Sequence, residues 1–279
     1  MEQNTATCAL APKDYKSDVK PVWCPGCGDY GVLSSMTKTL AGLGLDPKDV
    51  AVISGIGCSS RIPAYLKSYG FHGVHGRSLP LATGIKVSRP DLTVLVTGGD
   101  GDGFSIGGNH FMHACRRNVD MTYIVMDNQV YGMTKGQASP TTEPDWGNSK
   151  LTPGGTGINP FHPLVIALAS GANFIARCSS GDPNGTTRVL TEAIEHPGFS
   201  FVQILSPCVT FRPEQRDWKK TTRPAPVEPT DDPARAARML MNDDGVNVGV
   251  LYRGNRPVYQ PEMVSTVDSV ADLDRSFEV

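Results

Sequence analysis

Short apolar runs bounded by glycine or aspartate recur along this chain and alternate with segments of helical periodicity. This alternation constrains the fold most, because successive strand and helix units build a parallel sheet with helices on both faces. Runs this apolar are typical of strands buried on both sides. We predict strands at Val50 to Ser54, Leu92 to Thr97, Met121 to Met126, Phe174 to Ala176 and Phe199 to Leu205. The predicted helices are Tyr30 to Leu43, Ile106 to Arg117, Pro163 to Ala172 and Thr186 to His196.

Length and charge narrow the class of protein further. The 279 residues suffice for one large α/β domain with an ample core. A formal charge of -2 provides no broad basic field that could hold nucleic acid or an anionic membrane. The N-terminus lacks the features of a secretory signal, and no apolar stretch approaches the ~20 residues of a membrane span. We therefore expect a cytoplasmic protein that handles small molecules.

The sequence changes character at about Thr210. From there it is polar and rich in proline, with one short helical pattern around Pro233 to Met241. We predict an N-terminal segment over residues 1–22, a main domain over 23–209, and an extended C-terminal tail over 210–279 that packs on a partner subunit.

The most distinctive local motif is Cys24-Pro25-Gly26-Cys27, a pair of thiols in a turn. Taken alone it fits a thioredoxin-like pair, half a zinc site or half an iron-sulfur site. The residues before it are not strand-like, which argues against the thioredoxin type. Cys58 and Cys208 each follow a predicted strand and therefore lie at the carboxyl edge of the sheet, where α/β proteins place functional groups.

Four cysteines can thus converge, and either zinc or a cluster could use them. Zinc ribbons need two closely spaced cysteine pairs and the chain has one, so a cluster is favoured. Cys8, Cys115 and Cys178 are expected to be ordinary thiols, since free cysteine behaves as a small apolar residue.

A glycine-dense turn, Gly98-Gly99-Asp100-Gly101-Asp102-Gly103, follows the second predicted strand. Glycines let the backbone approach phosphate oxygens, and a following helix N-terminus adds partial positive charge. An aspartate can face a diphosphate only across a cation, and Mg²⁺ suits this role. Asn128 and the carbonyl of Val130, at the end of the next strand, supply two further oxygens.

The spacing between Gly99-Asp100-Gly101 and Asn128 resembles the shared signature of thiamine-diphosphate enzymes. Together with further motifs it covers Trp23 to about Cys208 and resembles the β subunits of 2-oxoacid:ferredoxin oxidoreductases, most of all the 2-oxoglutarate type. These motifs are, in order, CPGCGD, GIGCSSR, HGRSLPLATGIK, IGGNHFMHACRRN and DNQVYGMTKGQASPTT. The resemblance implies the thiamine-diphosphate-binding fold of the diphosphate-binding type.

The resemblance also implies a role for individual residues. One 4Fe-4S cluster would be held by Cys24, Cys27, Cys58 and Cys208, and Mg²⁺ by Asp100, Asn128 and the Val130 carbonyl. Contacts to the diphosphate and thiazole would come from Ile56, Gly57, Cys58, Ser59, His75, Asp102, Gly103, Gly132 and Met133.

The activity implied is CoA-dependent oxidative decarboxylation of a 2-oxoacid, reversible as reductive carboxylation, with electrons passing through the cluster to ferredoxin. The chain would need an α subunit, in an αβ heterodimer or (αβ)₂. Pyruvate or broad 2-oxoacid specificity is an alternative to 2-oxoglutarate. A non-redox thiamine-diphosphate enzyme with structural zinc is a second one, and an iron-sulfur electron carrier would leave the magnesium motif unexplained.

Lys135 follows the predicted Mg²⁺-binding turn directly. A cation there could reach the distal carboxylate of 2-oxoglutarate, a charge-assisted bond that pyruvate cannot make. A solvated loop lysine and a lysine facing CoA phosphates are the alternatives. We predict a catalytic role for Lys135 in reading the substrate.

Overall fold

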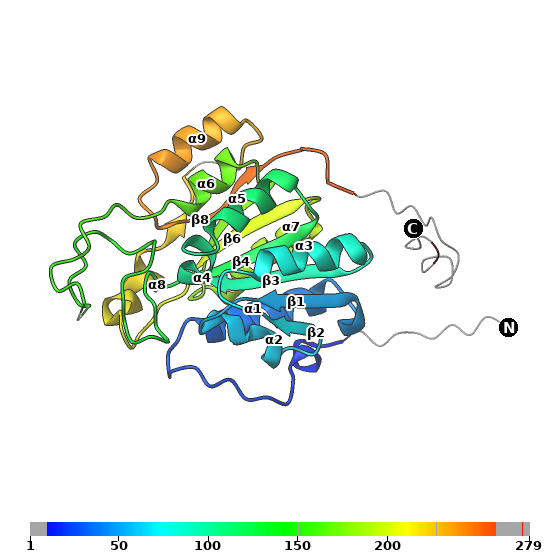
Figure 1. The fold of residues 1–279 in the computed structure, drawn as a ribbon, viewed down its shortest axis with the longest axis horizontal. Coiled ribbons are helices and arrows are strands. Elements are labelled where there is room, and N and C mark those ends of the chain that lie inside the picture. The colour runs from blue at the N-terminus through cyan, green and yellow to red at the C-terminus, as the bar shows by residue number, and fades with distance from the viewer. Residues whose placement is uncertain (1–9, 150, 227, 261–274, 276–279) are drawn as a thin grey trace.

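The computed structural model describes residues 10–149, 151–226, 228–260 and 275. An eight-stranded sheet forms its centre, in the strand order β2-β1-β3-β4-β6-β5-β8-β7 (Figure 1). The strands are β1 (Val50–Ser54), β2 (Tyr69–His72), β3 (Thr93–Gly99), β4 (Met121–Asp127), β5 (Phe174–Ser179), β6 (Phe199–Leu205), β7 (Arg223–Pro224) and β8 (Asn247–Arg253). All pairs are parallel except the one between β5 and β8.

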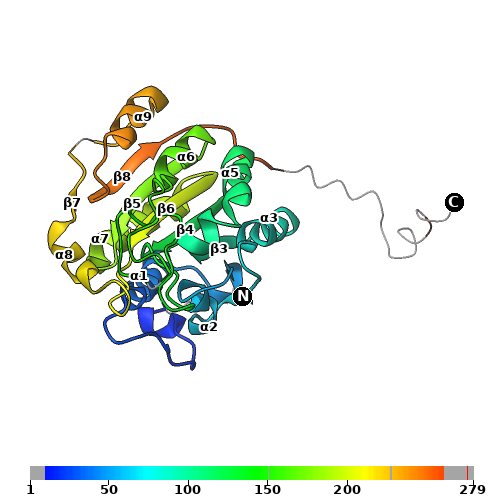
Figure 2. The same ribbon diagram turned by 60° about the vertical axis from the view of Figure 1, so that its left-hand side comes forward.

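Helices cover both faces of this sheet, as the two ribbon views show (Figures 1 and 2). They are α1 (Asp29–Gly42), α2 (Ile62–Tyr65), α3 (Ser78–Ser88), α4 (Asp100–Phe104), α5 (Gly108–Arg117), α6 (Pro163–Ala169), α7 (Pro183–Glu195), α8 (Trp218–Thr221) and α9 (Pro233–Met241). Single 3₁₀ turns are η1 (Pro12–Tyr15), η2 (Pro47–Asp49), η3 (Ser59–Arg61) and η4 (Pro213–Asp217). The arrangement confirms the predicted α/β class.

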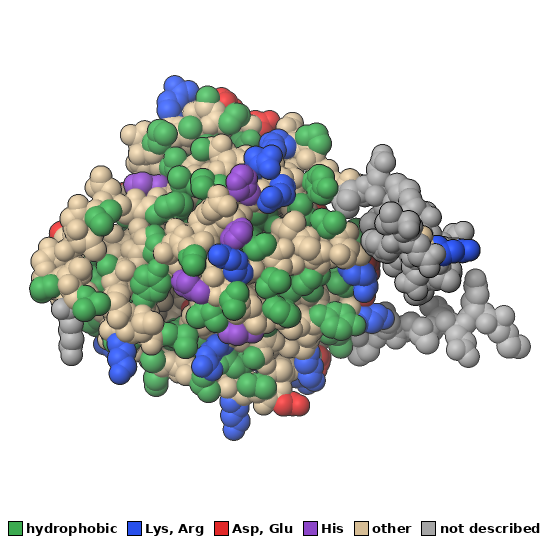
Figure 3. All heavy atoms as spheres, in the orientation of Figure 1, with side chains coloured by type: hydrophobic (Ala, Val, Ile, Leu, Met, Phe, Trp, Pro, Cys, Tyr) green, Lys and Arg blue, Asp and Glu red, His purple; other side chains and the backbone are tan. Residues whose placement is uncertain are grey.

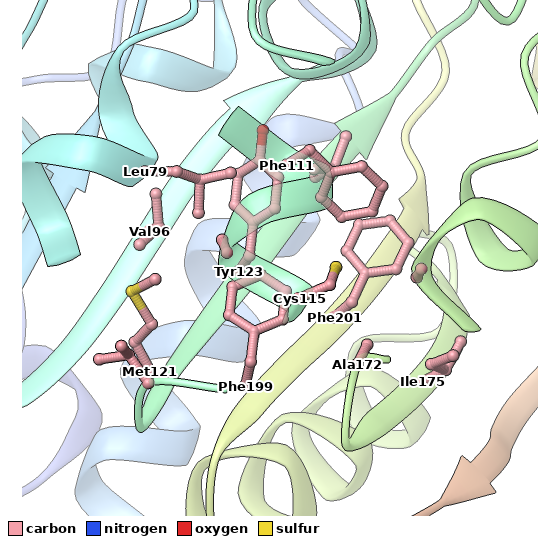
Figure 4. Packing of buried hydrophobic residues seen from close by; sticks show 14 of the residues in the cluster. Leu79, Val96, Phe111, Cys115, Met121, Tyr123, Ala172, Ile175, Phe199 and Phe201 are labelled. Carbon is pink, nitrogen blue, oxygen red and sulfur yellow. The ribbon is translucent and has the colours of Figure 1, made fainter. Parts of the chain in front are cut away.

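Each face of the sheet has its own hydrophobic core, because successive strand residues point to opposite sides. Tyr123 of β4 belongs to the core formed with α3, α5, α6 and α9, whereas its neighbour Ile124 belongs to the core formed with α1, α2 and α7. On the first face Phe111, Tyr123 and Phe201 point toward one another and form an aromatic centre (Figure 4). The two cores hold the strands rigidly enough to fix the loops at their ends.

The predicted strands and helices are all present, with small differences in extent. The bounds of β1, β6 and α9 agree with the prediction, while β5 runs three residues further, to Ser179. Sequence patterns missed β2, whose side chains are all exposed, and α3, which contains a proline and a glycine. They also missed α4, because the glycine-rich segment that was predicted as a turn is itself helical.

The segment from Thr210 onward contributes to this same fold. Its strand β8 pairs with β5 and its helix α9 packs on α6. Residues 1–9 and most of 261–279 lie outside the described residues. No helix in the described part of the chain combines the length and hydrophobicity that crossing a membrane requires.

Parallel strands bring their carboxyl ends to one edge of the sheet. At this edge β1 leads to Ile56, Gly57 and Cys58, β3 leads directly into α4, β4 leads to Asn128, and β6 leads to Cys208. Residues far apart in the sequence therefore meet there.

Candidate active site

A cavity of about 300 Å³ opens at the carboxyl ends of β1, β3 and β4. The predicted site residues that line it are Ile56, Gly57, Cys58, Ser59, His75, Asp100, Asp102, Asn128, Val130, Gly132 and Met133. Gly99 and Gly101 of the predicted glycine-dense turn line it as well, and so do Met126, Tyr131 and Thr134, which sequence analysis did not assign to the site. Tyr131 lies within the DNQVYGM motif, so its motif position was the available signal.

Asp100 begins α4 and is almost completely buried, with 1% of its surface exposed. The Thr141 hydroxyl lies 3.0 Å from Asp100 Oδ2 and 2.8 Å from Oδ1 of neighbouring Asp127, so its single proton is shared between the two carboxyls, and the Asn128 amide donates a weaker hydrogen bond to Asp100 Oδ1 at 3.4 Å. Burial, together with the charge of neighbouring Asp127, raises the pKa of Asp100 to about 7. A buried carboxyl of this kind favours a cation as partner.

The turn after β4 is arranged by Asn128, whose Oδ1 accepts a hydrogen bond from the Val130 amide at 3.1 Å. Gln129 between them has a positive φ of 54°. Asp100, Asn128 and Val130 thus line the same cavity, and a carboxylate, an amide oxygen and a backbone carbonyl are donors of the kind that Mg²⁺ prefers.

Asp102 braces the cavity wall. Its Oδ1 accepts hydrogen bonds from the backbone amides of Ile56 and Gly76, both at 2.8 Å, and lies 3.2 Å from Nδ1 of His75. Its Oδ2 is buried without a hydrogen-bond partner among the described residues. Asp102 therefore joins the loop after β1 to the loop before α3 and orients His75 at the cavity.

Two glycines make the close approaches at this site possible. A Cβ on Gly101 would lie 2.2 Å from the ring of Tyr131, so only glycine fits beneath this cavity residue. A Cβ on Gly103 would lie 2.2 Å from the Tyr123 hydroxyl. Gly103 thus packs against β4, and it is not among the cavity-lining residues.

The four predicted cluster ligands gather beside this cavity. The sulfur atoms of Cys208 and Cys58 both lie near Gly132, a residue that lines the cavity: a Cβ added to Gly132 would be 3.7 Å from Sγ of Cys208 and 3.9 Å from Sγ of Cys58. Burial, together with charges on Asp29, Cys208 and Cys24, raises the pKa of Cys58 to about 11. Burial and the charges of Asp29, Cys58 and Cys208 also raise the pKa of Cys27. Such thiols ionise together only when a positively charged group compensates them.

Two contacts join the loops that carry these cysteines. The Gly28 amide donates to the Pro207 carbonyl at 3.1 Å, and the Ser206 hydroxyl donates to Asp29 Oδ1 at 2.7 Å. Asp29 is 3% exposed, and burial raises its pKa to about 6.

The remaining described cysteines lie elsewhere. Cys115 is buried in α5 and Cys178 in β5, on opposite faces of the sheet. Cys8 lies outside the described residues. Among the residues that the structure describes, no three His, Cys, Asp or Glu side chains are arranged to hold a single metal ion.

Lys135 is exposed, has a positive φ of 79°, and is not among the cavity-lining residues, although its neighbour Thr134 is. Its loop is closed by hydrogen bonds from the Tyr131 amide to the Gln137 carbonyl at 2.9 Å and from the Gly136 amide to the Tyr131 carbonyl at 2.9 Å. Lys135 therefore projects from an ordered turn at the rim of the cavity.

Two residues that sequence analysis did not identify hold the site together. Arg212, 3% exposed, binds the Gln129 carbonyl at 3.1 Å and Glu143 at 2.8 Å and stacks over Trp146. Gln215 bonds both to the Cys208 amide and to the Asn128 carbonyl. No local pattern marks either residue, because their partners are far away in the sequence.

Comparison with known proteins agrees with this geometry. Residues 55–204 match the family described as thiamine pyrophosphate enzyme, C-terminal TPP binding domain. The chain is 39% identical to the 2-oxoacid:ferredoxin oxidoreductase subunit beta of Saccharolobus solfataricus, over 91% of this chain and 87% of that protein. It is 49% identical to the 2-oxoglutarate oxidoreductase subunit KorB of Mycobacterium tuberculosis, over 71% of this chain but only 53% of that protein.

Among solved structures, 2-oxoglutarate:ferredoxin oxidoreductase from Magnetococcus marinus, with 2-oxoglutarate, coenzyme A and succinyl-CoA bound, superimposes with a TM-score of 0.86. The two sequences are 44% identical, and the superposition covers 89% of this chain and 87% of the chain of that enzyme. These similarities confirm the family predicted from the sequence and the thiamine-diphosphate-binding fold. The chain belongs to the β subunits of the 2-oxoacid:ferredoxin oxidoreductases, an oxidoreductase family within the thiamine pyrophosphate enzymes.

Proposed function

We propose that this chain is the β subunit of a 2-oxoglutarate:ferredoxin oxidoreductase. The reaction joins 2-oxoglutarate and coenzyme A to give succinyl-CoA, CO₂, a proton and two electrons, which ferredoxin accepts; run in reverse it is reductive carboxylation. The observation that carries the proposal is the position of Cys58, which lines the cofactor cavity and also lies among the other cluster cysteines. A redox centre and an organic cofactor would share this one residue.

The cavity fits thiamine diphosphate, which supplies the chemistry that cleaves the bond between C1 and C2 of a 2-oxoacid. Helix α4 starts at the cavity floor, and the glycines around it leave the backbone accessible. We assign the diphosphate and thiazole contacts to Ile56, Gly57, Cys58, Ser59, His75, Gly132 and Met133, with Asp102 holding the loops that carry Ile56 and His75. Gly103 would act through packing rather than contact.

Mg²⁺ would be held by Asp100, Asn128 and the carbonyl of Val130, all at the cavity wall. Asp100 would neutralise part of the ion's charge. Thr141 keeps the Asp100 carboxyl in place, and the Asn128 side chain sets the turn that presents the Val130 carbonyl.

The four thiols of Cys24, Cys27, Cys58 and Cys208 would hold one 4Fe-4S cluster. Zinc needs sulfur atoms at about 2.3 Å from one centre. Ribbon-type zinc sites take two closely spaced cysteine pairs, whereas this chain has one such pair and two single cysteines from distant loops, a spacing that a cluster accepts. This supports the redox enzyme over a non-redox relative with structural zinc.

An α subunit is the expected partner, because thiamine enzymes need a carboxylate at the aminopyrimidine of the cofactor. Among the described cavity residues the carboxylates are Asp100 and Asp102; we assign Asp100 to Mg²⁺, and Asp102 holds the loops of the cavity wall. Glu143 and Glu192 are not among the residues that line the cavity.

Exposed apolar side chains fit a subunit interface beside the cavity. Phe71, Val74 and Met133 are each at least half exposed, and apolar side chains are spread over the face seen in Figure 3. Patches of this kind mark protein contacts. The α subunit would cover them in an αβ heterodimer or (αβ)₂. The many reduced cysteines suit a cytoplasmic location.

Lys135 would bind the distal carboxylate of 2-oxoglutarate from the cavity rim. A cation there discriminates against pyruvate and 2-oxobutyrate, which lack that carboxylate. A contact with the phosphates of coenzyme A is the alternative for the same side chain.

The proposal is tested by purifying the chain with and without its co-expressed partner. We expect the complex to be brown and to reduce a viologen dye when both 2-oxoglutarate and coenzyme A are present, with slower turnover of pyruvate. The chain alone should show no turnover. A colourless complex that contains zinc, or dye reduction by the chain alone, would contradict the assignment.

A further inference from the structure

The chain turns back after β6 and crosses the edge of the sheet that carries both cofactor positions. This strap, residues 206–217, contains Cys208, Arg212 and the 3₁₀ turn η4. Gln215 in η4 is a polar residue with only 1% of its surface exposed. A buried amide must have its hydrogen bonds satisfied inside the protein.

Both ends of the Gln215 amide are used. Oε1 accepts a hydrogen bond from the backbone amide of Cys208 at 2.9 Å, and Nε2 donates one to the carbonyl of Asn128 at 2.7 Å. The partners fix the orientation of the side chain, since a backbone N–H can only donate and a carbonyl can only accept. One side chain therefore links a cluster-binding residue to a residue of the Mg²⁺-binding turn.

Arg212 keeps Gln215 from moving. The Arg212 amide donates to the Cys208 carbonyl at 2.8 Å, and the Gln215 amide donates to the Arg212 carbonyl at 3.0 Å. The guanidinium of Arg212 binds the Gln129 carbonyl at 3.1 Å, beside Asn128. The strap is thus tied to the turn at two successive residues, and a displacement of the turn is transmitted to the Cys208 loop.

We propose that Gln215 is a positioning residue that couples the thiamine-diphosphate and Mg²⁺ site to the iron-sulfur cluster. The coupling rests on the function proposed above. When the cofactor fills the cavity, the turn that carries Asn128 is fixed in one position. Gln215, which is bonded to this turn, then fixes the position of the Cys208 amide. The reduction potential of the cluster shifts as a result, because hydrogen bonds around the cluster ligands set that potential. Linkage makes the effect reciprocal, so reduction of the cluster changes the affinity for the cofactor.

Gln215→Glu and Gln215→Leu distinguish the two hydrogen bonds of the Gln215 side chain, the one with the Cys208 amide and the one with the Asn128 carbonyl. Ionised glutamate still accepts from the Cys208 amide but cannot donate to the Asn128 carbonyl, so this variant is measured at high pH, where the buried carboxyl is charged, whereas leucine does neither at any pH. Arg216→Gln is the matched control, since Arg216 is the exposed neighbour on the same turn. Each variant is made in the complex with the partner subunit.

Two quantities are measured. The midpoint potential of the cluster is determined with and without thiamine diphosphate and Mg²⁺, by a redox titration followed by electron paramagnetic resonance. The dissociation constant of the cofactor is the second quantity. We expect the wild type and Arg216→Gln to show a cofactor-dependent shift in potential. Both Gln215 variants should lose that shift and bind the cofactor about three- to tenfold more weakly, as expected for one lost hydrogen bond. In Gln215→Leu the freed Cys208 amide should also raise the potential without cofactor.

A shift that persists undiminished in both Gln215 variants would show that the charge of the cofactor acts directly on the cluster and would overturn the coupling. A wild type without any shift would overturn it as well. A wild-type complex that lacks iron or does not bind thiamine diphosphate would instead contradict the proposed function. Near-isosteric Gln215→Glu keeps the test decisive if Gln215→Leu does not fold.

Discussion

The cofactor cavity and the four cysteines Cys24, Cys27, Cys58 and Cys208 lie side by side at one edge of the sheet, but the protein stabilises their functional groups in different ways. In the cavity, the protein already holds the functional groups: Asp100 accepts from Thr141, and Asp102 accepts from two backbone amides. Around the cysteines, the neighbouring groups are a buried carboxylate and other thiols, which oppose ionisation. The cavity is therefore prearranged, whereas the thiols would depend on the cluster that we propose for them.

The largest effect is expected from mutations of the four cysteines. Replacing Cys24, Cys27, Cys58 or Cys208 by serine should remove essentially all of the cluster, because the other thiols cannot ionise without it. Iron content and the visible absorption of the complex measure this.

Cys115→Ser and Cys178→Ser are the matched controls, since both thiols are buried in the cores; Cys8→Ser should keep its iron as well. Full iron in Cys208→Ser together with loss of iron in Cys178→Ser would show that the fourth ligand has been assigned wrongly.

The second prediction tests the cavity side through pH. The pKa of Asp100 is raised to about 7, so protons compete with Mg²⁺ for this carboxylate below that pH. The affinity for Mg²⁺ should fall about fiftyfold from pH 7 to pH 5, approaching tenfold per pH unit well below 7, and change little above pH 8. Cofactor binding titrated with Mg²⁺ at each pH measures it.

Asp127→Asn provides the control for this pH effect. The charge of Asp127 contributes to the raised pKa of Asp100, so its removal should move the loss of affinity to lower pH. An affinity independent of pH between 5 and 8 would mean that Asp100 does not bind the ion.

The third prediction concerns substrate recognition at the cavity rim. Lys135→Ala should lower kcat/KM for 2-oxoglutarate by about tenfold, the lower end for a charge-assisted bond made by an exposed side chain. The values for pyruvate and 2-oxobutyrate should change little, and so should the spectrum of the cluster. An equal loss with all three substrates would exclude a role for Lys135 in binding the distal carboxylate and favour a contact with coenzyme A.

The two regions also differ in how far the sequence predicts them. Asp100, Asn128, Cys58 and Cys208 stand at strand ends, so periodicity and spacing suffice to bring them together, whereas Cys24 and Cys27 precede α1 and are marked only by their own motif. Gln215 and Arg212 lie in a segment that looks like a polar tail, and their partners Asn128 and Gln129 are more than 80 positions away. Such contacts depend on the register of β6 beside β4, which no local pattern encodes. The exposed strand β2 and the proline-containing helix α3 were missed because their tertiary environment overrides local propensity.

The smallest effect is expected from a mutation of Asp29, the buried carboxylate beside the four cysteines. Asp29 is buried against Ser206, and a negative charge there disfavours the extra electron of a reduced cluster. Asp29→Asn keeps an oxygen for the Ser206 hydroxyl but removes the charge, so the iron content should stay unchanged and the midpoint potential at pH 8 should rise by about 30 mV, roughly threefold in a one-electron equilibrium. Because burial raises the pKa of Asp29 to about 6, the wild-type carboxyl is protonated at pH 5 and the difference between the two proteins should vanish there. Redox titrations at both pH values measure this. A difference that is the same at pH 5 and pH 8 would mean that Asp29 acts through packing and not through its charge.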